Sequence, residues 1–316
     1  MGILSTIFGT SKPTPDQQYD TLRDDGIRAM QIGEMPYAIK CFMAALELKR
    51  EPATTALLAE AHLRMGNHTE ALPLLQELHR LDAANKRVHL LLIETLGRLG
   101  HYEEERTASS EFLTQDPTHP AALYLAAEAD HGTGNHLAAI AHLTQSLTHE
   151  PNMLQAHRLR ATILAEMQQW NEALADAEVL LHNQPDDEDH LTLHAQILTA
   201  IGRHEEAVAD YEHLIALNPF ARTATLALGR LYVTLTRYDK ALALYDDAIE
   251  CQPDFAEAYK QRGAIKHHLH DDAGAADDLK KALELAPANE VVPDGEYTNM
   301  ENAMNDRYRA MNPYGF

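Results

Sequence analysis

Six prolines follow one another at intervals of 34 residues, and this spacing constrains the fold more than any other feature of the sequence. They are Pro117, Pro151, Pro185, Pro219, Pro253 and Pro287. A small residue keeps the same register at Ala71, Ala139, Ala173, Ala207, Ala241 and Ala275. Glu105 stands where the alanine series lapses. A fixed period of this length indicates a repeat protein, in which each unit buries its apolar face against its neighbours.

Each unit is predicted to form two amphipathic helices. A turn glycine ends the first helix in several units, at Gly66, Gly100, Gly134 and Gly202. The proline marks the loop after the second helix. Aromatic residues make up only 6% of the chain, and its abundant alanine and leucine favour helices over strands. We therefore expect an all-α chain of about eight helical hairpins.

The repeat resembles the tetratricopeptide repeat. In the best copy the matching residues are Leu228, Gly229, Tyr232, Ala241, Tyr245 and Pro253, with Tyr245 in place of phenylalanine. The resemblance covers residues 19–289, with repeats starting near Tyr19, Pro52, Lys86, Pro120, Leu154, Glu188, Arg222 and Ala256. It implies a right-handed α-α superhelix whose first helices line a concave groove, where proteins of this family usually hold peptides or partner domains.

The third repeat departs from the pattern. Small residues on most first helices allow close helix packing. In the third repeat Ile93 takes this position and Glu105 replaces the alanine of the second helix. We expect this repeat to pack less regularly.

The two ends of the chain lie outside the repeats. Residues 1–18 form an apolar segment and linker whose apolar run is too short for a signal peptide or membrane span. Weak membrane contact by this segment stays open, as does its lipidation. Residues 290–316 are predicted to hold a linker and a capping helix, because one helical face carries Met300, Met304, Tyr308 and Met311.

Charge and motif content exclude several classes of function. The formal net charge of -22 disfavours nucleic acid as a partner. Cys41 and Cys251 lie far apart, which suits a reducing compartment, and we expect a cytoplasmic protein. The sequence contains no phosphate-binding loop, dinucleotide fingerprint, zinc-protease motif or nucleophile elbow. We therefore predict a protein that is not an enzyme and needs no cofactor.

The family's geometry selects a row of side chains on the first helices as the groove. The predicted peptide-binding residues are Glu60, Arg64, Glu94, Arg98, Tyr124, Glu128, Arg158, Arg230 and Lys260. Glu60, Glu94 and Glu128 occupy equivalent places, so a partner with Lys or Arg at every third position would match them. The alternative is a solvated face, because Arg64 and Arg98 follow the first two glutamates by one helical turn. Glu128 has Gly132 at that position and was expected to lack an intrahelical partner.

Histidine is abundant, with 19 residues, and it concentrates in the acidic repeats four to six. His190 and His194 stand one turn apart, which makes them weak candidates for metal binding. The alternative is a set of ordinary surface histidines, and we predict no metal site. The function predicted first is a non-enzymatic scaffold or adaptor, monomeric or dimeric, that binds a protein or peptide. A self-assembling structural array, a metal-dependent enzyme and a pH sensor remain as alternatives.

Overall fold

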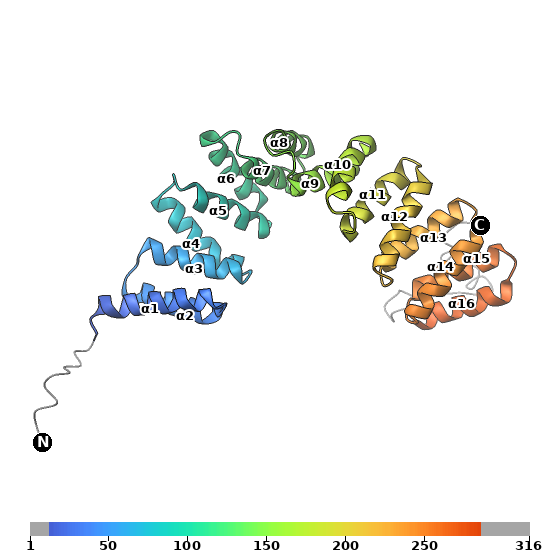
Figure 1. Cartoon of the computed structure of the whole chain (residues 1–316), viewed down its shortest axis with the longest axis horizontal. Helices are drawn as coiled ribbons and strands as arrows, with labels where there is room; N and C mark the ends of the chain where they lie inside the picture. The colour runs from blue at the N-terminus through green and yellow to red at the C-terminus, as the bar shows by residue number, and fades with distance from the viewer. Residues whose placement is uncertain (1–12, 286–316) are drawn as a thin grey trace, which may run out of the picture. The chain divides into compact units, whose positions relative to one another are not determined.

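The computed structural model describes residues 13–285, in which sixteen helices occur and no strand does (Figure 1). The chain divides into two compact units, Met1–Arg160 and Ala161–Phe316, with the boundary inside α9 (Leu154–Glu166). Unit 1 contains α1 (Pro15–Gln31), α2 (Met35–Leu48), α3 (Pro52–Arg64), α4 (His68–Leu81), α5 (Lys86–Arg98), α6 (Tyr102–Gln115), α7 (Pro120–Gly132) and α8 (His136–His149). Unit 2 contains α10 (Trp170–Asn183), α11 (Glu188–Ala200), α12 (His204–Leu217), α13 (Arg222–Thr234), α14 (Tyr238–Cys251), α15 (Ala256–His268) and α16 (Asp272–Leu285). The all-α prediction is confirmed.

The helices form antiparallel hairpins stacked in chain order within each unit. From α1 to α8, and again from α10 to α16, every helix contacts the next one. First helices of successive hairpins also touch, as α5 touches α7 in unit 1 and α13 touches α15 in unit 2. Side chains on neighbouring first helices therefore face a common surface, which is the geometry that a groove requires.

The alanine series lies in the interior of the hairpins. Ala71, Ala139, Ala173, Ala207 and Ala241 are fully buried. Ala275, the last of the series, is 3% exposed. A methyl group at this position lets the two helices of a hairpin approach closely, so that larger side chains interlock on either side.

The turn inside each hairpin adopts a left-handed backbone conformation at one fixed position. Glycine occupies it at Gly33, Gly66, Gly100, Gly134 and Gly202, with φ between 73° and 83°. Other residues occupy it at Gln168, Thr236 and His270, with φ of 59°, 56° and 64°. Glycine adopts this conformation without a steric penalty, whereas the Cβ atom of other residues makes it unfavourable.

The first helix begins earlier than the first repeat was predicted to begin. α1 starts at Pro15, four residues before Tyr19, and has 17 residues where α3 has 13. A capping box between Thr14 and Gln17, followed by proline at the first helical position, extends the helix by one turn. The repeat register did not include these capping residues.

Two predictions lie outside the described residues. One is the apolar N-terminal run, and the other is the capping helix with its methionine stripe. None of the helices within residues 13–285 has both the length and the apolar character that crossing a bilayer requires.

Candidate functional site

A pocket of about 310 Å³ lies in unit 1 beside the first helices α5 and α7. Its lining residues are Glu94, Gly97, Arg98, Tyr102, Glu128, His131, Gly132 and Leu159. Glu94, Arg98 and Glu128 belong to the predicted groove set, and the structure brings them together here. We call these eight residues the α5–α7 pocket.

Glu60, which is half-buried, and Glu94, which is exposed, each pair with an arginine on their own helix. Arg64 Nη2 lies 2.6 Å from Glu60 Oε1, and Arg98 Nη2 lies 3.9 Å from Glu94 Oε1. Arg87, which was not predicted, lies 3.8 Å from the other oxygen of Glu60. Exposed pairs of this kind contribute about 0.3–0.5 kcal/mol. Both glutamates are therefore partly neutralised, as the solvated-face alternative expects, but by contacts weak enough to exchange with a ligand.

Glu128 differs because burial affects the ionisation of its half-buried carboxyl group. Burial raises the pKa of its carboxyl group, while a hydrogen bond from the Tyr124 hydroxyl and the charge of Arg98 act in the opposite direction. The expectation that Glu128 has no intrahelical partner was wrong. Its partner is Tyr124, one turn before it, which was predicted as a groove residue and not as a partner of Glu128.

Glu105 is a site residue that the groove prediction missed. It lies on α6 with no exposed surface, and neither carboxylate oxygen has a hydrogen-bond partner. Burial raises the pKa of Glu105 to about 8, and the charge of Glu128 contributes to the increase. The carboxyl group is therefore mostly protonated at neutral pH. The sequence signal for this residue was its position, because Glu105 stands where the other second helices have alanine.

Two glycines that line the α5–α7 pocket make room for the side chains of Glu105 and Tyr102. A Cβ atom at Gly97 would lie 2.5 Å from Glu105 Oε1, and one at Gly132 would collide with the ring of Tyr102. The third hairpin thus keeps regular helix lengths because Gly97 provides the space that Glu105 needs. Ile93, the other exception, is fully buried in an apolar cluster that includes Phe112 and Leu125.

The remaining groove candidates do not line the α5–α7 pocket. Arg158 is exposed on the part of α9 that belongs to unit 1. In unit 2, Arg230 is exposed on α13, and Lys260 Nζ lies 3.5 Å from Glu257 on α15. The basic end of the predicted groove therefore remains a prediction.

A larger hollow of about 510 Å³ lies elsewhere in unit 1, among α2, α3 and α4. Met43, Leu46, Leu58 and Leu74 form much of its wall. Its apolar residues have the same spacing as core residues, so no sequence signal distinguishes them. It contains none of the predicted groove residues.

The two histidines proposed as weak metal candidates contact different carboxylates in unit 2. His194 Nδ1 lies 2.7 Å from Asp210, which is a hydrogen bond. His190 Nδ1 lies 3.6 Å from Asp187, which is too long for one. Among the described residues, these two histidines are not part of a cluster of three metal-type ligands.

Comparisons with known proteins agree with the repeat period. A tetratricopeptide-repeat family model matches residues 56–120, 192–254 and 226–290, and a second model described in the same way matches residues 131–197. No curated protein shows a significant sequence match.

Solved structures share the fold at low sequence identity. The C-terminal part of a TPR repeat-containing protein from Cytophaga hutchinsonii superposes with a TM-score of 0.63 at 14% identity, over 73% of this chain and 95% of its own. A tetratricopeptide repeat protein from Parabacteroides merdae has a TM-score of 0.58 at 17% identity, over 84% and 99%. A MamA fragment from Desulfovibrio magneticus has a TM-score of 0.50 at 18% identity, over 53% and 94%. At these identities the likeness establishes the fold alone.

Proposed function

Because the chain belongs to the tetratricopeptide-repeat family, we propose that it is a non-enzymatic scaffold that binds an extended segment of a partner protein along the first helices of unit 1. The observation that carries this proposal is the α5–α7 pocket. It combines two carboxylates, Glu94 and Glu128, with an aromatic ring and an apolar side chain.

The pocket has the chemistry to hold a lysine or arginine side chain. A cationic head group would contact Glu94 and Glu128, and its hydrocarbon stem would lie along Tyr102 and Leu159. The face of Tyr102 adds a favourable cation–π interaction. Arg98 and Arg158 are internal competitors, since both act on Glu128. The 3.9 Å contact of Arg98 with Glu94 is long enough to be replaced by a better placed cation.

Long-range charge supports the same class of partner. The chain carries 48 acidic and 26 basic side chains, so its field attracts a basic segment. Attraction of this kind accelerates association and weakens as salt is added. Direct contact with Glu94 and Glu128 should instead determine how long the segment stays bound.

The first experiment uses a fluorescent peptide with lysine at every third position, and a sequence-matched peptide with glutamine instead. Anisotropy is measured at low and high salt for the natural chain and for Glu94→Gln/Glu128→Gln. We expect the double variant to bind the lysine peptide roughly tenfold or more weakly, because it loses two charge-assisted contacts. The glutamine peptide should bind poorly to both.

The matched control is Glu104→Gln/Glu172→Gln, which removes two charges from exposed positions outside the α5–α7 pocket. It should lower the association rate slightly and leave dissociation unchanged. If both double variants bind the lysine peptide equally weakly, the α5–α7 pocket is not the binding site and the overall charge of the chain explains the attraction. The same variants identify the natural partner by affinity capture: it should be retained by the natural chain and the control but not by the pocket variant.

A further inference from the structure

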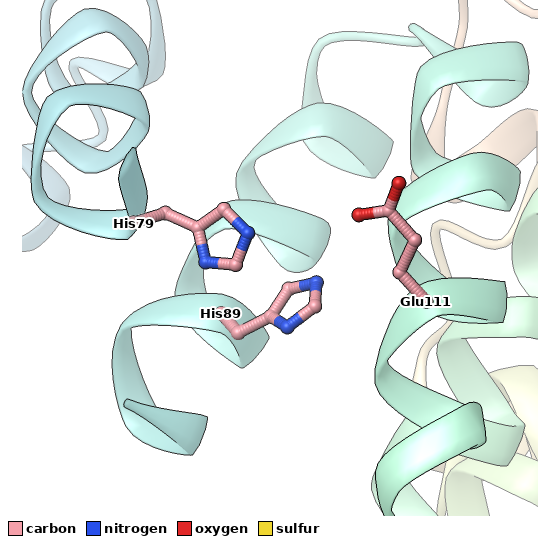
Figure 2. A group of neighbouring side chains, drawn as sticks. All are labelled: His79, His89 and Glu111. Atoms are coloured by element: carbon pink, nitrogen blue, oxygen red, sulfur yellow. The ribbon is translucent and has the colours of Figure 1, made fainter. Parts of the chain in front are cut away.

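His79, His89 and Glu111 come together in unit 1 from three consecutive helices, α4, α5 and α6 (Figure 2). One potential ligand atom of each residue lies within 4.8 Å of the other two. Figure 2 shows both rings and the carboxylate directed toward one another. None of these residues lines the α5–α7 pocket. The cluster joins the second hairpin to the third.

Two ring nitrogens of this cluster are buried without a hydrogen-bond partner. They are His79 Nδ1 and His89 Nε2. The His89 residue is only 2% exposed, and its ring centroid lies 4.2 Å from that of His79. Buried polar atoms are almost always paired, so the partnerless Nε2 atom of His89, on the side of the ring that Figure 2 shows directed toward Glu111, requires an explanation. A bound cation would satisfy it.

The backbone holds one nitrogen of His89. The backbone carbonyl of Ala108 accepts a hydrogen bond from the ring. A backbone acceptor of this kind orients a histidine that binds metal through its other nitrogen.

The histidine–glutamate cluster is closed on one side and open to solvent on the other. The ring of Phe112 meets His89 edge-on, with centroids 5.4 Å apart, and Phe112 itself is 2% exposed. This side of the cluster is therefore closed and dry. Glu111 is exposed, so the cluster is open to solvent on the carboxylate side.

We propose that His79, His89 and Glu111 bind a divalent transition-metal ion of the zinc type, with a fourth position left for water or a partner's side chain. Two imidazoles with one carboxylate form a donor set that suits zinc, and three protein ligands leave one tetrahedral position open. Donors around a tetrahedral zinc ion stand roughly 3.4 Å apart, since its bonds are about 2.0–2.1 Å long. From separations of no more than 4.8 Å, the three side chains therefore need to close by at most about 1.4 Å on binding. The exposed side chain of Glu111 is free enough to make this movement.

The bound ion would connect three helices and strengthen the joint between the second and third hairpins. A ligand that binds only the folded state raises its stability by mass action. Metal binding should therefore appear both as stoichiometric uptake and as a higher melting temperature. If a water molecule fills this space instead of a metal ion, neither stoichiometric metal uptake nor a higher melting temperature should be seen.

The test uses the full chain without a histidine tag, freed of metal with chelator and then titrated with zinc by calorimetry. Cobalt serves as a second probe, because four-coordinate cobalt gives intense visible absorption. The variants are Glu111→Gln and His79→Asn, whose side chains are exposed or partly exposed and are expected to leave the fold intact. Circular dichroism checks their folding. The control is His149→Asn, which removes an exposed histidine elsewhere in unit 1.

We expect one tight zinc equivalent in the natural chain and in the control, and at least tenfold weaker binding in both site variants. Zinc should raise the melting temperature of the first two proteins more than that of the site variants. Binding that is unchanged by Glu111→Gln and His79→Asn would overturn the site. Absence of a stoichiometric equivalent in the natural chain would overturn it as well.

Discussion

Replacing Glu105 by glutamine keeps the shape of a buried side chain and removes its ability to ionise. In the unfolded chain this carboxyl group loses its proton near pH 4.5, whereas burial in the third hairpin moves its pKa to about 8. Between these two values the folded protein binds one proton more than the unfolded chain. The free energy of unfolding therefore falls as the pH rises through this window, and the loss is complete above the folded pKa.

The size of the effect follows from the two pKa values. A change from 4.5 to about 8 corresponds to at most about 5 kcal/mol above pH 8, and to at most about 3 kcal/mol at pH 7. Relaxation of the surroundings and water penetration when a buried group ionises reduce this cost. We therefore expect Glu105→Gln to be more stable than the natural chain by about 2–4 kcal/mol near pH 9 and about 1–2 kcal/mol near pH 7.

Urea denaturation followed by circular dichroism, at several values between about pH 4 and pH 9, measures this difference. The two proteins should have nearly equal stability at the acid end, where Glu105 is protonated in both states. Glu104→Gln is the control, because Glu104 carries the same charge on the exposed face of α6. A stability difference that does not grow with pH would refute the buried, protonated state of Glu105.

Two further predictions concern the packing of unit 2 and are checked by the same denaturation assay. Arg262→Met should lower the free energy of unfolding by about 2–4 kcal/mol, because Asp278 is 4% exposed and loses one of its cationic partners. The control Lys281→Met removes an exposed ion pair and should lower it by less than about 1 kcal/mol. Gly229→Ala should lower the free energy of unfolding by about 1–3 kcal/mol, because the added methyl group would collide with the hydroxyl of Tyr245. An unchanged stability would contradict this prediction and show that the ring moves aside freely.

The helical hairpins could be predicted from the sequence because their signals are local and repeated. Pro52 and Pro120 begin helices, and Gly66 and Gly100 occupy left-handed turns. The same turn at Thr236 could not be recognised from its residue type. Its conformation is imposed by the two helices on either side.

The candidate sites were less predictable because they depend on contacts between hairpins. Glu105 was visible as an exception, but its burial depends on the space at Gly97, which only the packed hairpin shows. His79, His89 and Glu111 lie on three different helices, and no spacing within one helix identifies them. His190 and His194 had a favourable spacing on α11, but His194 forms a hydrogen bond with Asp210, and spacing within one helix does not reveal such contacts.

The left-handed turns differ between the two units, and this difference should determine where the array opens first. Within residues 13–285, all four such turns in unit 1 are glycines, whereas three of the four in unit 2 are Gln168, Thr236 and His270. Each of these three positions stores roughly 1 kcal/mol of backbone strain. In a linear array each hairpin is stabilised only by itself and its neighbours, so local strain is not averaged over the whole chain. Amide hydrogens next to these three turns should exchange sooner than those next to the glycine turns, and proteases should cut unit 2 first.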